Sequence, residues 1–171
     1  KRADVVVVSR ADLVPSNRRV WIREEARRHA GEIPILESRH APRDLVDGEG
    51  RGSPLVGLKG QGIAAFCGIG NPEGFRRTLE SLGCRVVDLR VFPDHHPYTA
   101  ADVEELIQWA DASKAEFVLT TQKDLVKLRL SELGDAPLRA LRIGLDLLGD
   151  SGPLEDLLAG LLPQPRPVLE G

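Results

Sequence analysis

The sequence predicts an α/β fold with a mostly parallel sheet and helices on both of its faces. From residue 61 onward, short apolar runs alternate with stretches of helical periodicity, which is the pattern of strands joined by right-handed helical crossovers. Aromatic residues make up 4% of the chain and hydrophobic residues 42%, so we expect a core built mainly of aliphatic side chains. The length of 171 residues suits a domain of ordinary size.

We expect residues 1–60 to form a junction segment. The Val-rich run at 5–8 predicts a buried strand, because it is β-branched and lacks polar alternation. Ser16 or Asn17 can cap a following helix, and residues 33–36 predict a second short strand. Residues 39–62 are rich in glycine and proline and predict a loop or loose hairpin, with a domain boundary near Gly60. The helix also carries five arginines, for which either a solvated face or contact with anionic lipid headgroups stays open: Arg18, Arg19, Arg23, Arg27 and Arg28.

Residues 61–171 are expected to form the main α/β domain. Strands are predicted at 63–67, 85–92, 116–120 and 141–145, and helices at 72–82, 100–112, from 123 and at 153–162. Three helix starts carry capping residues, and Gly83 is expected to end the first of these helices. The caps are Asn71 before Pro72, Thr99 with Asp102, and Thr121 with Asp124. Pro163, Pro165 and Pro167 predict a tail.

Charge and composition disfavour several classes of protein. A net charge of −3 gives no basic field for nucleic acid, which we therefore do not expect as a partner. Cys67 and Cys84 are too few and too far apart for a CxxC site, so buried thiols in a reducing compartment are expected. No apolar run approaches the roughly 20 residues of a membrane span, and a cytoplasmic location is expected. Since the chain has no methionine, we expect that its natural start is missing.

Three motifs follow three predicted strands, and the carboxyl ends of parallel strands meet at one edge of a sheet, where α/β proteins bind ligands. The first motif contains Gly68 and Gly70, which allow close backbone approach, and Asn71, which opens a helix whose positive end favours an anion. A plain turn and cap is the alternative. Because the third glycine is Gly74, the spacing is GxGxxxG and not the dinucleotide-binding fingerprint.

The second motif contains the two candidate catalytic residues, Asp94 and His95. An imidazole at a ligand-facing strand end can orient a catalytic carboxylate, shuttle a proton or donate to phosphate. A histidine that only fixes the loop is the alternative. Metal ligation by Asp94, His95 and His96 is not expected, because neighbouring side chains diverge in an extended loop.

The third motif places Lys123 and Lys127 four residues apart near a helix start. Side chains at this spacing share one helix face, so the two ammonium groups can form an anion cradle. The alternative is that both lysines are solvated. Arg10, with Asp12, follows the first strand and could reach the same edge if that strand is parallel to the others.

The runs AFCGIGNPEGF (65–75), FPDHHPY (92–98) and TQKDLVK (121–127) together resemble the C-terminal half of the tetraacyldisaccharide 4'-kinase (lipid A 4'-kinase) family, and KRADVVVV (1–8) resembles its domain junction. The resemblance implies a three-layer, P-loop-kinase-like C-terminal domain. It also implies transfer of the ATP γ-phosphate, with Mg²⁺, to the 4'-hydroxyl of a tetraacyl glucosamine disaccharide lipid, at the cytoplasmic face of the bacterial inner membrane as a peripheral protein. By this match, His95 partners a catalytic aspartate from the N-terminal half.

Two departures from that family qualify the match. Gln122 stands where the family usually has an acidic residue, and no GxxxxGK[ST] phosphate-binding loop occurs anywhere in the chain. We therefore expect the C-terminal portion of a kinase that is inactive alone, with ATP and Mg²⁺ bound mainly by the N-terminal half. The alternative is a stand-alone, non-catalytic α/β module that binds an anionic ligand or a partner. A Rossmann-like oxidoreductase is disfavoured by the glycine spacing.

Overall fold

The computed structural model describes residues 3–161 and contains two compact units. The first unit combines the described residues up to Ala41 with those from Leu145 onward, and the second unit is Pro42–Gly144. The chain therefore passes between the units within two strands, β2 (Ile35–Val46) and β8 (Ala136–Leu148). Gly60, where the sequence predicts a domain boundary, lies inside the second unit. Residues 1 and 2, the predicted helix end at 162 and the predicted proline tail lie outside the described residues.

In the first unit, β1 (Val6–Val8) pairs in parallel with β2, with Val6 opposite Ile35. The short 3-10 helix η1 (Ala11–Leu13) and the helices α1 (Ser16–Ala30) and α5 (Gly152–Leu161) complete this unit. The prediction that Ser16 or Asn17 caps α1 is wrong, because Pro15 occupies the N-cap position and no side chain caps the helix. Arg19 and Arg23 approach Glu37 of β2 at 2.8 Å and 3.6 Å, so part of the arginine-rich face contacts the sheet.

The segment predicted to be irregular is largely ordered. Strand β2 continues to Val46, β3 (Gly52–Ser53) turns back antiparallel to it, and the 3-10 helix η2 (Leu55–Leu58) follows. Asp47 stabilises the hairpin turn, because its carboxylate accepts the backbone N–H groups of Glu49 at 3.0 Å and Arg51 at 2.9 Å. The loose-hairpin alternative is therefore correct for 47–53, whereas the loop prediction is wrong for 39–46.

The sheet of the second unit is mostly parallel, as predicted. Its strand order is β2-β8-β6-β4-β5. Strand β4 (Gly62–Cys67) pairs in parallel with β5 (Arg85–Val91) and with β6 (Phe117–Thr121), and β6 pairs in parallel with β8. The two-residue strand β7 (Glu132–Leu133) pairs antiparallel with the start of β8 and was not predicted.

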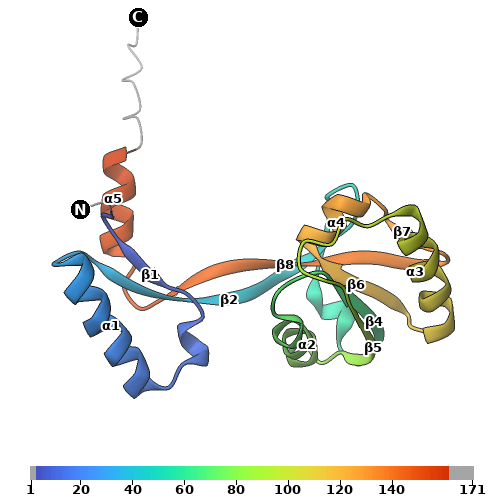
Figure 1. The fold of residues 1–171 in the computed structure, drawn as a ribbon, viewed down its shortest axis with the longest axis horizontal. Coiled ribbons are helices and arrows are strands. Elements are labelled where there is room, and N and C mark those ends of the chain that lie inside the picture. The colour runs from blue at the N-terminus through green and yellow to red at the C-terminus, as the bar shows by residue number, and fades with distance from the viewer. Residues whose placement is uncertain (1–2, 162–171) are drawn as a thin grey trace, which may run out of the picture. The chain divides into compact units, whose positions relative to one another are not determined.

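Helices cover both faces of this sheet, which confirms the three-layer prediction (Figure 1). Every residue of the central strand β4 is buried. Phe66 packs with Leu106 and Trp109 of α3 (Ala100–Ser113) on one face, where α4 (Gln122–Leu128) also lies. On the other face, Cys67 packs with residues of α2 (Pro72–Ser81). Alternation along β4 therefore supplies two hydrophobic cores, the first of which contains most of the chain's aromatic side chains, and these cores hold the carboxyl end of β4 in place.

The three helix caps predicted for the main domain are confirmed. The Asn71 side chain accepts the Gly74 N–H, Thr99 and Asp102 form a capping box, and Thr121 accepts the Asp124 N–H. Gly83 follows α2 with a φ of 81°, in the left-handed region that ends many helices. Each of the three strand-to-helix junctions is thus set by local hydrogen bonds. No helix within residues 3–161 has the length and apolar character needed to cross a membrane.

Candidate functional site

The loops after β4, β5 and β6 meet at the carboxyl edge of the sheet, as predicted. The Gly68 N–H after β4 donates to Asp124 Oδ2 of α4 at 3.0 Å. The Gly68 carbonyl in turn accepts the N–H of His95, after β5, at 3.2 Å. A Cβ atom at Gly68 would lie 3.1 Å from the Pro93 carbonyl oxygen and 3.2 Å from Asp124 Oδ1, so the missing side chain lets the three loops close together.

His95 projects from a tight turn. Residues 93–96 form a β-turn in which the His96 N–H donates to the Pro93 carbonyl at 3.1 Å. His95 has a φ of 61°, a left-handed conformation that non-glycine residues adopt at a cost and that often marks functional positions. Its side chain is 72% exposed, and its Nε2 lies 3.9 Å from Asp94 Oδ1. The carboxylate of Asp94 also lies beside Gly70, where a Cβ atom would be 3.5 Å from Asp94 Oδ2.

His96 has a different role from His95. Its ring stacks on Phe92 with centroids 4.8 Å apart and meets the Tyr98 ring edge-on at 5.0 Å. Its Nε2 lies 3.1 Å from Asp102 Oδ2. Hydrogen bonds from Thr99, with a smaller contribution from His96, hold the pKa of Asp102 below its usual value. His96 is therefore the histidine that fixes the loop, and His95 is the one that faces solvent.

A buried carboxylate, Asp124, connects the three loops. It is fully buried and accepts the Thr121 hydroxyl at 2.6 Å as well as the Gly68 N–H. Burial, together with the charge of Asp124, raises the pKa of the Cys67 thiol to about 11 and also raises the pKa of Tyr98. These groups therefore stay neutral at physiological pH, and Cys67 is a buried free thiol, as predicted.

The two predicted phosphate-binding lysines are used differently. Lys127 Nζ donates to the His96 carbonyl at 3.1 Å and lies 3.8 Å from Asp124 Oδ1. Lys123 is exposed and makes no hydrogen bond or ion pair with another residue of 3–161. The sequence predicts Asp124 as a helix cap, and its pairing with Lys127 is not among the predicted contacts. The signal was present, because a buried capping aspartate followed three residues later by a lysine can form an intrahelical ion pair.

Asn71 acts as a helix cap, because its side-chain oxygen accepts the Gly74 N–H at 3.0 Å. We expect Asn71→Ala to lower the free energy of unfolding of this chain by about 1 kcal/mol, since an N-cap oxygen satisfies an otherwise unpaired helix donor. Urea denaturation checks this, with Asn71→Ser, which keeps a capping oxygen, as the matched control. Equal losses in the two variants would show that the cap contributes little.

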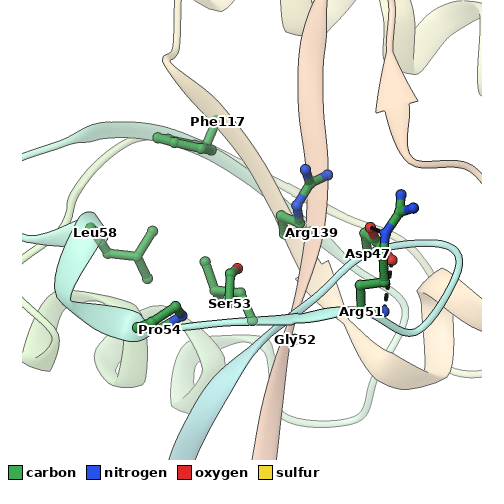
Figure 2. A pocket seen from close by; sticks show the side chains of 10 residues that line it. Asp47, Arg51, Gly52, Ser53, Pro54, Leu58, Phe117 and Arg139 are labelled. Carbon is green, nitrogen blue, oxygen red and sulfur yellow. Dashed lines mark hydrogen bonds and ion pairs between the residues drawn. The ribbon is translucent and has the colours of Figure 1, made fainter.

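Arg10 lies in the first unit, before η1, with a φ of 54°, and its role at the edge stays a prediction. A hollow of about 360 Å³ occurs elsewhere in the second unit, lined by Leu58, Phe117, Arg139 and others (Figure 2). None of the predicted site residues lines it. The candidate site is thus the exposed edge that carries His95. Within residues 3–161, no group of three or more His, Cys, Asp or Glu side chains could hold a metal ion.

Comparison with known proteins identifies the family. The family described as tetraacyldisaccharide-1-P 4'-kinase matches residues 1–162. The chain is 41% identical to the tetraacyldisaccharide 4'-kinase of Anaeromyxobacter sp. (strain K) over 98% of its length and 46% of that protein. It is 45% identical to the tetraacyldisaccharide 4'-kinase of Syntrophus aciditrophicus (strain SB), over 56% of its length and 26% of that protein.

A solved structure shows the same fold. It is LpxK from Aquifex aeolicus, crystallised in complex with ATP, with a TM-score of 0.56 and 22% identity over 92% of this chain and 51% of that one. Nearly all of this chain is matched by these two proteins, but it spans only about half of the length of each of them. The family match over residues 1–162 and the 41% identity show that the chain belongs to the tetraacyldisaccharide 4'-kinase family.

Proposed function

We propose that this chain supplies the C-terminal half of a kinase that transfers the ATP γ-phosphate to the 4'-hydroxyl of a tetraacyl glucosamine disaccharide lipid. Family membership supports the reaction class. The observation that carries the role of this half is the exposed His95 side chain, held in a left-handed turn at the ligand-binding edge of the sheet. We further propose that the enzyme acts as a peripheral protein at the cytoplasmic face of the inner membrane.

His95 is proposed to orient the carboxylate that accepts the proton of the sugar hydroxyl. Phosphoryl transfer depends mainly on positioning and on charge stabilisation, so a correctly placed base and its partner are the protein's main contribution. The His95 ring is 72% exposed, which leaves it accessible to an aspartate supplied by the other half. Asp94 lies 3.9 Å from His95 Nε2 and is proposed to help set the ring's orientation.

The main binding elements for the nucleotide and the metal ion are proposed to lie in the other half of the enzyme. This chain contains no GxxxxGK[ST] loop, and the described residues hold no cluster of metal-ligating side chains. ATP and Mg²⁺, when bound, would supply the transferred phosphoryl group and its charge neutralisation, and we assign both to the N-terminal half that the longer relatives contain. The alternative of an anion-binding module has weaker support, because protein oxygens already engage the Gly68 N–H and the Lys127 ammonium group.

The test is His95→Ala in the complete enzyme, made by joining this chain to its N-terminal half. We expect kcat for the disaccharide lipid to fall by about 100-fold or more, with little change in ATP affinity, because the imidazole acts on the catalytic carboxylate and not on the nucleotide. His95→Gly is the control for backbone strain, since glycine adopts the left-handed conformation freely and should lose the same activity. Unchanged turnover in both variants would reject the role of His95.

A further inference from the structure

We infer that Lys127 is a positioning residue for His95, a role that rests on the proposed function. Its ammonium group bridges the buried Asp124 carboxylate and the carbonyl of His96, the residue after His95. It therefore joins the fixed interior of the second unit to the turn that presents the imidazole.

Lys127 supplies a positive charge beside the buried carboxylate of Asp124. A fully buried carboxylate is costly unless hydrogen bonds and an opposite charge compensate the lost hydration. Gly68 and Thr121 donate hydrogen bonds, and both go to Oδ2. The buried Tyr98 hydroxyl also hydrogen-bonds to the Asp124 carboxylate, and Lys127 Nζ, the nearby positive charge, lies 3.8 Å from Oδ1. The ammonium group of Lys127 is therefore held by the charge of Asp124.

Lys127 carries this restraint to the turn. Its side chain is 29% exposed, and its Nζ lies 3.1 Å from the His96 carbonyl oxygen and 5.8 Å from the centre of the Tyr98 ring. The cation thus lies against the loop that it fixes, with attraction from the ring face adding to the hydrogen bond.

Two connections to Asp124 enclose His95. On one side, the His95 N–H donates to the Gly68 carbonyl, and the Gly68 N–H donates to Asp124. On the other side, the His96 carbonyl accepts from Lys127, which pairs with Asp124. A left-handed histidine persists only where its surroundings determine it, and these two connections provide that constraint.

The first measurement is amide hydrogen exchange at His95 in this chain. We expect Lys127→Met, which keeps the aliphatic stem but loses the charge and the donor, to speed exchange of the His95 N–H. Lys123→Met is the matched control for exchange, because it removes the same charge from the same helix at a position without such contacts. Lys127→Gln serves the same comparison should the methionine variant fail to fold.

The second measurement is turnover in the complete enzyme. Lys127→Met is expected to lower kcat by about 10- to 100-fold at unchanged ATP affinity, because a displaced imidazole loses its alignment. Lys127→Arg keeps the charge and can reach the His96 carbonyl, so we expect it to retain part of the turnover that Lys127→Met loses. If Lys127→Met leaves exchange of the His95 N–H unchanged, the positioning role is overturned, even if that variant loses activity. If His95→Ala itself leaves turnover unchanged, the proposed function fails, while exchange still decides whether Lys127 holds the turn.

Discussion

Replacing Phe66 by alanine is expected to lower the free energy of unfolding of the second unit by about 3–5 kcal/mol. Phe66 is fully buried on the central strand β4. Its ring meets those of Phe92, Tyr98 and Trp109 edge-on, with centroids 6.3, 5.9 and 6.5 Å apart. Truncation would leave a cavity and remove these edge-to-face contacts. Because the chain has few aromatic residues, few other rings are available to fill the cavity.

Urea denaturation in a Trp21→Phe background measures this loss. The chain has two tryptophans, and Trp21 lies in the first unit whereas Trp109 is buried in the second, so the remaining fluorescence reports the second unit alone. Circular dichroism provides a probe that is independent of the Phe66–Trp109 contact. Val56→Ala is the control, because Val56 is 83% exposed and its truncation should change stability by less than about 0.5 kcal/mol. A loss below 1 kcal/mol for Phe66→Ala would contradict the prediction.

Asp124→Ala is expected to cost about 3–5 kcal/mol in the same assay. Two hydrogen bonds to a charged acceptor are lost, from Gly68 and from Thr121, and each such bond contributes about 1.5–3 kcal/mol. The Gly68 N–H would also remain buried without a partner, because the three loops close around it.

Asp124→Asn is the matched variant, since it keeps the shape and an acceptor oxygen but removes the charge. We expect a smaller loss than for alanine, because the Gly68 N–H retains an acceptor. If asparagine costs as much as alanine, the charge pairing with Lys127 outweighs the hydrogen bonds. If neither variant loses stability, the buried carboxylate does not hold the loops together.

Features set by local chemistry could be predicted from the sequence, and features set by distant partners could not. The starts of α2, α3 and α4 depend on caps such as Asn71 and Thr99 within a few residues of their targets, and all three are correct. The continuation of β2 through Asp44 depends on a partner nearly one hundred residues away, because Arg142 of β8 donates to its carboxylate at 2.7 Å. Glycine and proline content therefore misled the prediction for 39–46.

The same distinction applies to the candidate site. The meeting of the three motifs at one edge follows from parallel topology, so it could be predicted. Only the family resemblance distinguished the two adjacent histidines and selected His95, because residue types alone do not reveal the left-handed φ of His95 or the stacking of His96 upon Phe92. The pairing of Lys127 with the His96 carbonyl likewise depends on tertiary contact between α4 and the loop after β5.

The division of the chain into units also has a consequence for synthesis on the ribosome. The second unit is one continuous segment, Pro42–Gly144, whereas the first needs residues from both sides of it. Because translation proceeds from the N-terminus, the sheet that carries His95 can fold as soon as residue 144 has left the exit tunnel. The first unit is complete only once residues from Leu145 onward have been made, so the unit that begins first along the chain is completed last.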